Sequence, residues 1–182
     1  FIALAKAQAG KLSYASSGNG GTLHLGAEML KLAATIDMLH VPFKGAAPAI
    51  VALLGGEVDI AILDTPPLLP HIRSGKLKVL AVASEKRSRV LPQVPTFAEA
   101  GYPGFVMASW SGLFVPAGTP PAIIQRLHGD FAKALRAPDV QARLAELATE
   151  VVAMPPAEFA AVLRAEYDKF GKLIRELGIS VN

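Results

Sequence analysis

The sequence predicts an α/β protein built on a parallel β-sheet. Short apolar runs alternate with amphipathic segments from residue 12 to about residue 103. This alternation is typical of strands that are connected by helices in a parallel sheet. Hydrophobic residues make up 52% of the chain and the mean hydropathy is +0.39, which suits strands buried on both faces. No apolar run reaches the roughly 18 residues that a membrane span needs.

The first half of the chain supplies the strands. Residues 1–7 read as the end of an amphipathic helix that Gly10 stops, so we expect the chain to be a fragment. The missing leader is then uninformative about targeting. We expect strands at 12–15, 38–43, 58–63 and 77–83, separated by helices at about 22–33, 48–54 and 66–74.

The second half is predicted to be mostly helical. Residues 106–115 read as an extended segment with Trp110 in its middle, and the change from strands to helices near residue 116 is the expected domain boundary. Helices are expected at 122–136, 138–148 and 156–177, with a short strand at 150–153.

Charge and cysteine content exclude several function classes. The chain has 18 Lys and Arg against 15 Asp and Glu, a net charge of +3, and its densest basic run is Lys86, Arg87 and Arg89 without aromatic neighbours. This pattern indicates a solvated loop and not a nucleic-acid interface. The absence of cysteine excludes disulfides, thiolate catalysis and cysteine-bound metals, but it does not identify a compartment.

A glycine-rich loop between the first strand and its helix is the strongest candidate site. Its members offer hydroxyl and backbone N–H donors beside a helix N-terminus, which favours a bound anion. The candidate ligand residues are Ser16, Ser17, Gly18, Gly20 and Thr22. The anion can be a carboxylate or a phosphate, and a flexible connection without a ligand is the alternative. The loop fits neither a dinucleotide fingerprint nor a P-loop.

Two further strand-to-helix connections add candidates. Gly45 and Ala46 offer backbone N–H groups to the same cavity, whereas the neighbouring Lys44 reads better as an exposed loop residue. Asp64 follows the strand at 58–63, where its carboxylate can accept a hydrogen bond from a ligand. The alternative is that Asp64 or Thr65 caps the next helix.

The remaining candidates point away from catalysis. Trp110 fits a wall of a ligand cleft beside a hinge, or ordinary core packing. The histidines lack metal-ligand spacing, and His24 reads as a packed or capping residue. No nucleophile elbow or acid pair is present, so we expect no catalytic residues, no metal and no cofactor.

Several motifs follow one another along the chain. In order, they are 13–25 (SYASSGNGGTLHL), 40–49 (HVPFKGAAPA), 80–84 (LAVAS), 87–88 (RS), 91–101 (LPQVPTFAEAG) and 110–120 (WSGLFVPAGTP). In this order and spacing they resemble the Bug family, the solute receptors of tripartite tricarboxylate transporters. The resemblance covers essentially the whole chain. It implies a type II periplasmic-binding-protein fold, in which two α/β lobes close on a ligand.

The resemblance also implies a function and a site. It implies a periplasmic receptor that holds a carboxylate through loop N–H groups, hydroxyls and water, and hands it to a membrane permease. The positions that match the ligand loops of the family are Ser16, Gly18, Gly20, Thr22, Gly45, Ala46 and Asp64. Trp110 matches the hinge region.

The chain departs from the family pattern at its start. The resemblance implies a further long stretch before Phe1 that begins the first lobe and supplies another ligand loop. The expected organisation is an end of a first-lobe or linking helix (1–11), a complete second lobe (12–105), a hinge (106–118) and a helical C-terminal part of the first lobe (119–182). Without the first-lobe sheet, the C-terminal helices predict a homodimer or a domain swap.

Two other functions remain open on the sequence. One is an enzyme that acts on a phosphorylated or carboxylated metabolite, with the glycine-rich loop as its anion cradle and His24 as its base. The other is the effector-binding domain of a transcription factor, which shares the type II fold.

Overall fold

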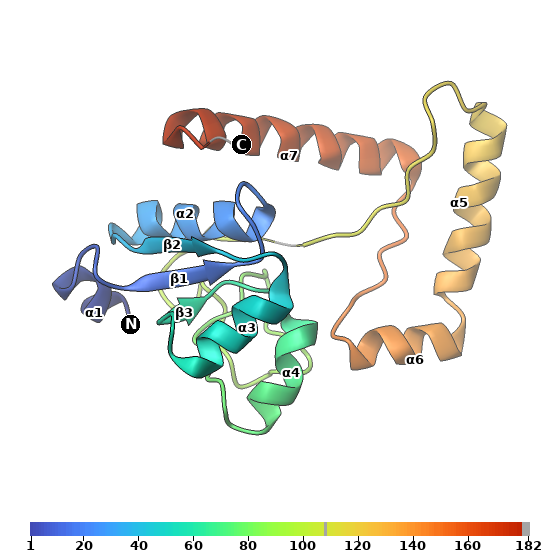
Figure 1. Ribbon diagram of the computed structural model, residues 1–182. Coiled ribbons are helices and arrows are strands. Elements are labelled where there is room, and N and C mark those ends of the chain that lie inside the picture. Colours follow the sequence, from blue (N-terminus) through green and yellow to red (C-terminus); the bar gives the residue numbers. More distant parts are fainter. Residues whose placement is uncertain (108, 180–182) are drawn as a thin grey trace. The chain divides into compact units, whose positions relative to one another are not determined.

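The chain forms two compact units. The computed structural model describes residues 1–107 and 109–179 (Figure 1). One unit comprises Phe1–Ser109 with the chain from Leu177 onward, and the other comprises Trp110–Glu176. The division lies inside the segment 106–118, and the assignment of the units to two lobes stays a prediction. Ala108 and residues 180–182, which belong to the predicted hinge and C-terminal part, lie outside the described residues.

The first unit is built on a parallel sheet with the strand order β2-β1-β3. The strands are β1 (Ser13–Ser16), β2 (Leu39–Pro42) and β3 (Ile60–Ala61). Tyr14 of β1 pairs with His40 on one side and with Ile60 on the other. Because the strands run parallel, their carboxyl ends meet at one edge of the sheet.

Helices cover both faces of this sheet. The helices of the first unit are α1 (Ile2–Ala7), α2 (Thr22–Ala34), α3 (Ala46–Gly55) and α4 (Thr65–Arg73). Figure 1 shows α2 on one face and α3 on the other. Successive strand residues follow this division: Tyr14 packs in a core cluster with Leu30 of α2, and Ala15 packs in a second cluster with Ala49 of α3. The α/β class and these helices are therefore confirmed.

The predicted strand at 77–83 is wrong. Its ladder contact in the described part of the chain is a single bridge between Val82 and Thr96. The Val82 N–H donates to the Pro95 carbonyl at 2.9 Å, and the Ala83 carbonyl accepts from the Met107 N–H at 2.7 Å. An apolar run favours extended backbone, but a strand needs a continuous partner ladder, and here the bonds go to separate segments.

Two other strand predictions also need correction. The expected strand at 58–63 shortens to the two residues of β3, because β1 offers a register of only two pairs there. Residues 150–153 form no strand and lie between two helices without a neighbouring ladder.

The second unit is helical. Its helices are α5 (Pro121–Leu135), α6 (Pro138–Glu146) and α7 (Pro156–Leu177), each with proline in its first turn as predicted. Among its described residues, Ala132 is the buried hydrophobic side chain. Ile123, Phe131 and Leu163 remain 49%, 46% and 37% exposed. None of the helices in the described ranges is both long and apolar enough to span a membrane.

Candidate functional site

Three helices begin at the carboxyl edge of the sheet. α2, α3 and α4 follow β1, β2 and β3 in the sequence, so parallel strands bring their N-termini to one edge. Their N-cap residues are Gly21, Gly45 and Asp64, and none of these makes a side-chain hydrogen bond that caps its helix. Uncapped first-turn N–H groups and helix dipoles favour an anion at this edge.

The alternative that the Asp64 side chain caps the next helix is therefore wrong. Asp64 is the N-cap of α4, but its carboxylate makes no cap hydrogen bond, and the residue is exposed. Its position agrees with the predicted place at the end of the third strand. The neighbouring Thr65 is the first residue of the helix.

The two predicted ligand loops lie against each other. The Gly45 N–H donates to the Ser17 carbonyl at 3.2 Å, and the Phe43 N–H donates to the Ser16 carbonyl at 3.1 Å. Gly45 has a φ of 101°, a conformation that favours glycine, and Ala46 is half-buried at the start of α3. The structure thus brings the loops after β1 and β2 together, but the Gly45 N–H serves the protein itself.

Part of the glycine-rich loop also turns inward. Ser16 is fully buried, and its Oγ donates to the Gly18 carbonyl at 2.9 Å and lies 2.7 Å from Nε2 of His40. The Gly20 N–H donates to Nδ1 of His24 at 3.0 Å. The sequence predicts that Ser16 and Gly20 face a shared cavity, whereas in the described structure both donate their hydrogen bonds within the protein. Ser17 is half-buried and Thr22 is exposed, so both are accessible to a ligand.

A buried polar network lies beneath the loop. The Tyr14 hydroxyl donates to Oε1 of Glu28 at 2.7 Å, and Lys31 Nζ lies 3.1 Å from the same oxygen. The rings of His24 and His40 stack with centroids 3.8 Å apart, and the Tyr14 ring stacks on His40 at 4.8 Å. The partly buried side chains of Glu28 and Lys31 therefore form an ion pair within this network.

Burial shifts the acid–base behaviour of this network. Burial, followed by the hydrogen bond to Glu28, raises the pKa of Tyr14 well above its usual 10. Burial also lowers the pKa of His24, with the charge of Lys31 acting in the same direction and Glu28 acting against it. Burial and the neighbouring His24 lower the pKa of His40 to about 4. Both imidazoles are therefore neutral at pH 7.

Sequence reasoning found only part of this network. The interpretation of His24 as a packed residue is confirmed, because the side chain is 6% exposed and accepts the loop N–H. Tyr14, Glu28 and His40 were not identified. The available signal was their spacing: Tyr14 and His40 are opposite each other on neighbouring strands, and His24 and Glu28 are one helical turn apart.

Trp110 lies in the second unit, whereas the other candidate residues lie in the first. Its indole N–H donates to the carboxylate of Glu166, and its ring meets Phe159 edge-on at 5.1 Å. The Phe114 ring also lies near Phe159, with the ring centroids 5.7 Å apart. Both Glu166 and Phe159 belong to α7, so Trp110 holds the segment before α5 against that helix within the second unit.

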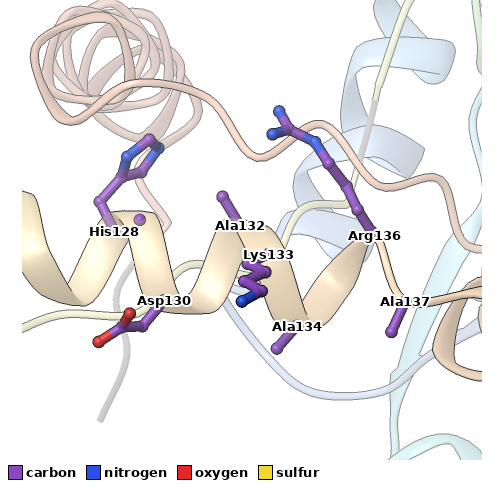
Figure 2. A pocket seen from close by; sticks show the side chains of 8 residues that line it. His128, Asp130, Ala132, Lys133, Ala134, Arg136 and Ala137 are labelled. Carbon is purple, nitrogen blue, oxygen red and sulfur yellow. The ribbon is translucent and has the colours of Figure 1, made fainter.

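A hollow of about 830 Å³ lies beside α5. Figure 2 shows that His128 and Ala132 point to one side of the helix, whereas Asp130 and Ala134 point to the other. Polar groups that do not converge cannot orient a ligand. Among the described residues, no group of three or more His, Asp or Glu side chains is placed to hold a metal ion.

Comparison with known proteins decides the family. Residues 1–179 match the family described as "Tripartite tricarboxylate transporter family receptor". The chain belongs to this receptor family. Protein BugT of Bordetella pertussis is 39% identical over 178 residues, which cover 97% of this chain and 54% of BugT. The resemblance to the Bug family is thereby confirmed.

Solved structures agree with this assignment to the receptor family. The periplasmic binding protein BugD matches with a TM-score of 0.81 at 32% identity, over 98% of this chain and 60% of BugD. Rpa4515 of R. palustris, solved with adipate, gives 0.87 at 32%, over 98% and 60% of the two chains. MatC of Rhodopseudomonas palustris, solved with bound malate, gives 0.81 at 30%, over 96% and 60%. The periplasmic-binding-protein fold is therefore confirmed for a chain that spans about half the length of BugT.

Proposed function

We propose that this receptor-family chain forms the carboxylate-binding part of a periplasmic solute receptor, which delivers its ligand to the permease of a tripartite transporter. The observation that carries the proposal is the close structural match to Rpa4515, which was solved with adipate. Malate bound to MatC supports the same ligand class. We further propose that the chain catalyses no reaction, since the family is one of receptors.

The ligand carboxylate is proposed to lie at the carboxyl edge of the sheet. The first-turn N–H groups of α2 and α3 would donate to it, at Thr22 and Ala46, and the hydroxyls of Ser17 and Thr22 would add donors. Asp64 would accept from a ligand hydroxyl or amine. Gly18, Gly20 and Gly45 would then shape the loops, and Ser16 would support them from inside.

The proposed roles disfavour an enzyme built on the same loop. That function requires His24 as a base beside the anion. In the structure the His24 ring is buried and its Nδ1 already accepts the Gly20 N–H. A base must reach the proton that it removes, and this nitrogen is occupied.

Binding of dicarboxylates tests the proposal. We would titrate the chain with adipate and malate by calorimetry and thermal shift, with inorganic phosphate and a nucleotide as controls. We expect a response to one or both carboxylates and none to phosphate. A response to phosphate alone, or no carboxylate binding even when the chain is completed to the length of BugT, would show that the proposal is wrong.

A matched pair of variants ties the response to the loop. Thr22→Val keeps the shape of the side chain and removes its hydroxyl, so affinity should fall about 5-fold, the effect of one hydrogen bond. Thr149→Val, in the second unit, makes the same chemical change and should leave the affinity unchanged. Equal effects of the two variants would contradict a site at the start of α2.

Self-association of the chain is a separate proposal. Apolar side chains of the second unit such as Ile123, Phe131 and Leu163 are exposed to between 37% and 49%. We propose that a second copy covers them, in a homodimer or a domain swap. Light scattering behind a sizing column should then give twice the chain mass, and a monomer at high concentration would exclude the idea.

A further inference from the structure

The amide of Gly20 donates inward, to a histidine and not to the outside of the loop. Gly20 has a φ of 73°, and its N–H lies 3.0 Å from Nδ1 of His24, one turn into α2. A ring nitrogen accepts a hydrogen bond only when it carries no proton. His24 must therefore be neutral, with its proton on Nε2.

The other side of the ring favours the same tautomer. Nε2 of His24 lies 4.0 Å from Oε1 of Glu28, a carboxylate oxygen held by the Tyr14 hydroxyl at 2.7 Å and by Lys31 at 3.1 Å. A fixed negative oxygen stabilises an N–H that points towards it. The direction of the Gly20 bond is thus set by groups on β1 and α2.

His40 extends the support to the start of the loop. Its ring stacks on His24 at 3.8 Å with 10° between the planes, and its Nε2 lies 2.7 Å from the Ser16 Oγ. Ser16 donates to the Gly18 carbonyl, so its hydroxyl is placed to accept from Nε2–H of His40. The stacked pair thereby bonds the loop at Ser16 and at Gly20.

We propose that His24 is a positioning residue for the glycine-rich loop: its neutral ring holds the Gly20 N–H inside the protein and leaves the first turn of α2 open to the ligand. This inference rests on the proposed function only in assuming that a ligand binds at the first turn of α2. The anchoring of the loop by His24 is a property of the free chain and can be measured without any ligand.

Acid should release this anchor. The titratable groups that face His24 are Glu28 and Lys31 on α2, Tyr14 on β1 and His40 on β2; Asp37, 3.6 Å from Lys31, extends the set. A proton on Nδ1 would place two N–H donors face to face at Gly20 and a cation against the neighbouring ring. The loop bond therefore exists only in the neutral state.

The test follows the Gly20 amide by NMR in the 15N-labelled chain. His24→Leu removes the acceptor, whereas His24→Asn places an amide oxygen near the position of Nδ1. Exchange of the Gly20 amide with solvent should be about 5- to 30-fold faster in His24→Leu, the factor that corresponds to a bond of one to two kcal/mol, and slow again in His24→Asn. His71→Asn, a histidine change on α4, is the control and should alter nothing at Gly20.

A pH titration distinguishes this role from simple packing, because a packed side chain would not couple the Gly20 amide signal to the protonation of His24. In the unmodified chain, the Gly20 amide signal should shift with the same midpoint as the His24 ring, and this shift should vanish in His24→Asn. The proposal would be overturned if the Gly20 amide exchanged with solvent without protection, or if its signal did not change as His24 titrates. If His24→Leu does not fold, the titration and the His24→Asn variant still decide.

Binding of adipate separates this inference from the proposed function. Affinity should fall in His24→Leu and recover in His24→Asn if both ideas hold. If adipate does not bind at all while Gly20 behaves as described, His24 still anchors the loop and the choice of ligand is wrong. If adipate binds equally to all variants, the positioning role of His24 is wrong and the receptor function stands.

Discussion

The rings of His24 and His40 stack face to face, with centroids 3.8 Å apart and 10° between their planes. Burial lowers the pKa of both, and that of His40 reaches about 4 from its usual 6.5. The unfolded chain therefore binds more protons than the folded chain between these values. The contribution of the two histidines to the free energy of unfolding should be complete above pH 7 and should fall as the pH drops from 6.5 towards 4.

We expect urea unfolding to show this loss when it is followed by circular dichroism at pH 7.5, 6 and 5. Because His40 is partly exposed, the loss should be about 1–2 kcal/mol, less than the full shift implies. His40→Phe keeps a ring in the stack but removes the titrating group, so its stability should depend less on pH over this range. An equal pH dependence in the variant would assign the effect to other groups.

Tyr14 supports the second prediction. Its side chain is fully buried and its hydroxyl donates to Glu28 at 2.7 Å. Tyr14→Phe leaves that carboxylate with one donor fewer in a partly buried site, so the free energy of unfolding should fall by about 1–3 kcal/mol. Denaturant unfolding measures the loss.

Tyr102→Phe is the matched control for Tyr14→Phe. Tyr102 is half-buried and packs beside the same core cluster. The same deletion of one hydroxyl should therefore cost much less there. Similar losses at the two positions would mean that the bond to Glu28 contributes nothing specific.

The sheet and its helices were predictable because their signals are local. Tyr14 and Ala15 face opposite sides of the sheet and are both buried, and the sequence shows this as a short apolar run followed by an amphipathic segment. Gly45 and Gly56 bracket α3, and prolines open α4 and α5. The class of the fold follows from such patterns without knowledge of long-range contacts.

The rest depends on partners that are distant in the sequence. Residues 77–83 have the composition of a strand, but their bonds go to Pro95 and Met107, which no local pattern reveals. The direction of the Gly20 N–H depends in the same way on where His24 points. The sequence predicts that the loop has donors, whereas the fold decides which of them face outward.

Arg87 and Glu99 form a bond that the basic run at 86–89 does not suggest. Arg87 Nε lies 3.0 and 2.8 Å from the two oxygens of Glu99, which also accepts from the Thr96 N–H at 2.8 Å. The hydrogen bond from Arg87, followed by that from Thr96, holds the pKa of Glu99 below its usual 4.5. The resulting stabilisation is present above the unfolded pKa and is lost as the pH falls.

Carboxyl NMR titration of Glu99 should show this low pKa directly. Arg87→Gln should raise the value towards 4.5, although Thr96 keeps part of the shift. Lys86→Gln removes a neighbouring positive charge in the same run and should leave the titration of Glu99 nearly unchanged. If both changes move Glu99 equally, the run acts by general charge and not through the Arg87 bond.

Two helical glycines should respond in opposite ways to alanine. At Gly129 in α5, an added Cβ meets nothing within 4 Å, so Gly129→Ala should stabilise the chain by about 0.5–1 kcal/mol. At Gly26 in α2, the Cβ would lie 2.3 Å from the sulfur of Met107 and 2.8 Å from its methyl carbon. The end of the methionine side chain is flexible, but Met107 packs against the core cluster of this unit, so displacing it should turn the gain into a loss of about 1 kcal/mol.

A double-mutant cycle identifies the cause of the loss at Gly26. Met107→Ala removes the obstructing side chain, so Gly26→Ala should become neutral or stabilising in that background. Thermal unfolding of the four chains, followed by circular dichroism, gives the coupling between the two positions. If Gly26→Ala stabilises the unmodified chain as Gly129→Ala does, Met107 does not pack against this face of α2. The contact between residues 105–107 and α2, the helix that follows the glycine-rich loop, would then be wrong.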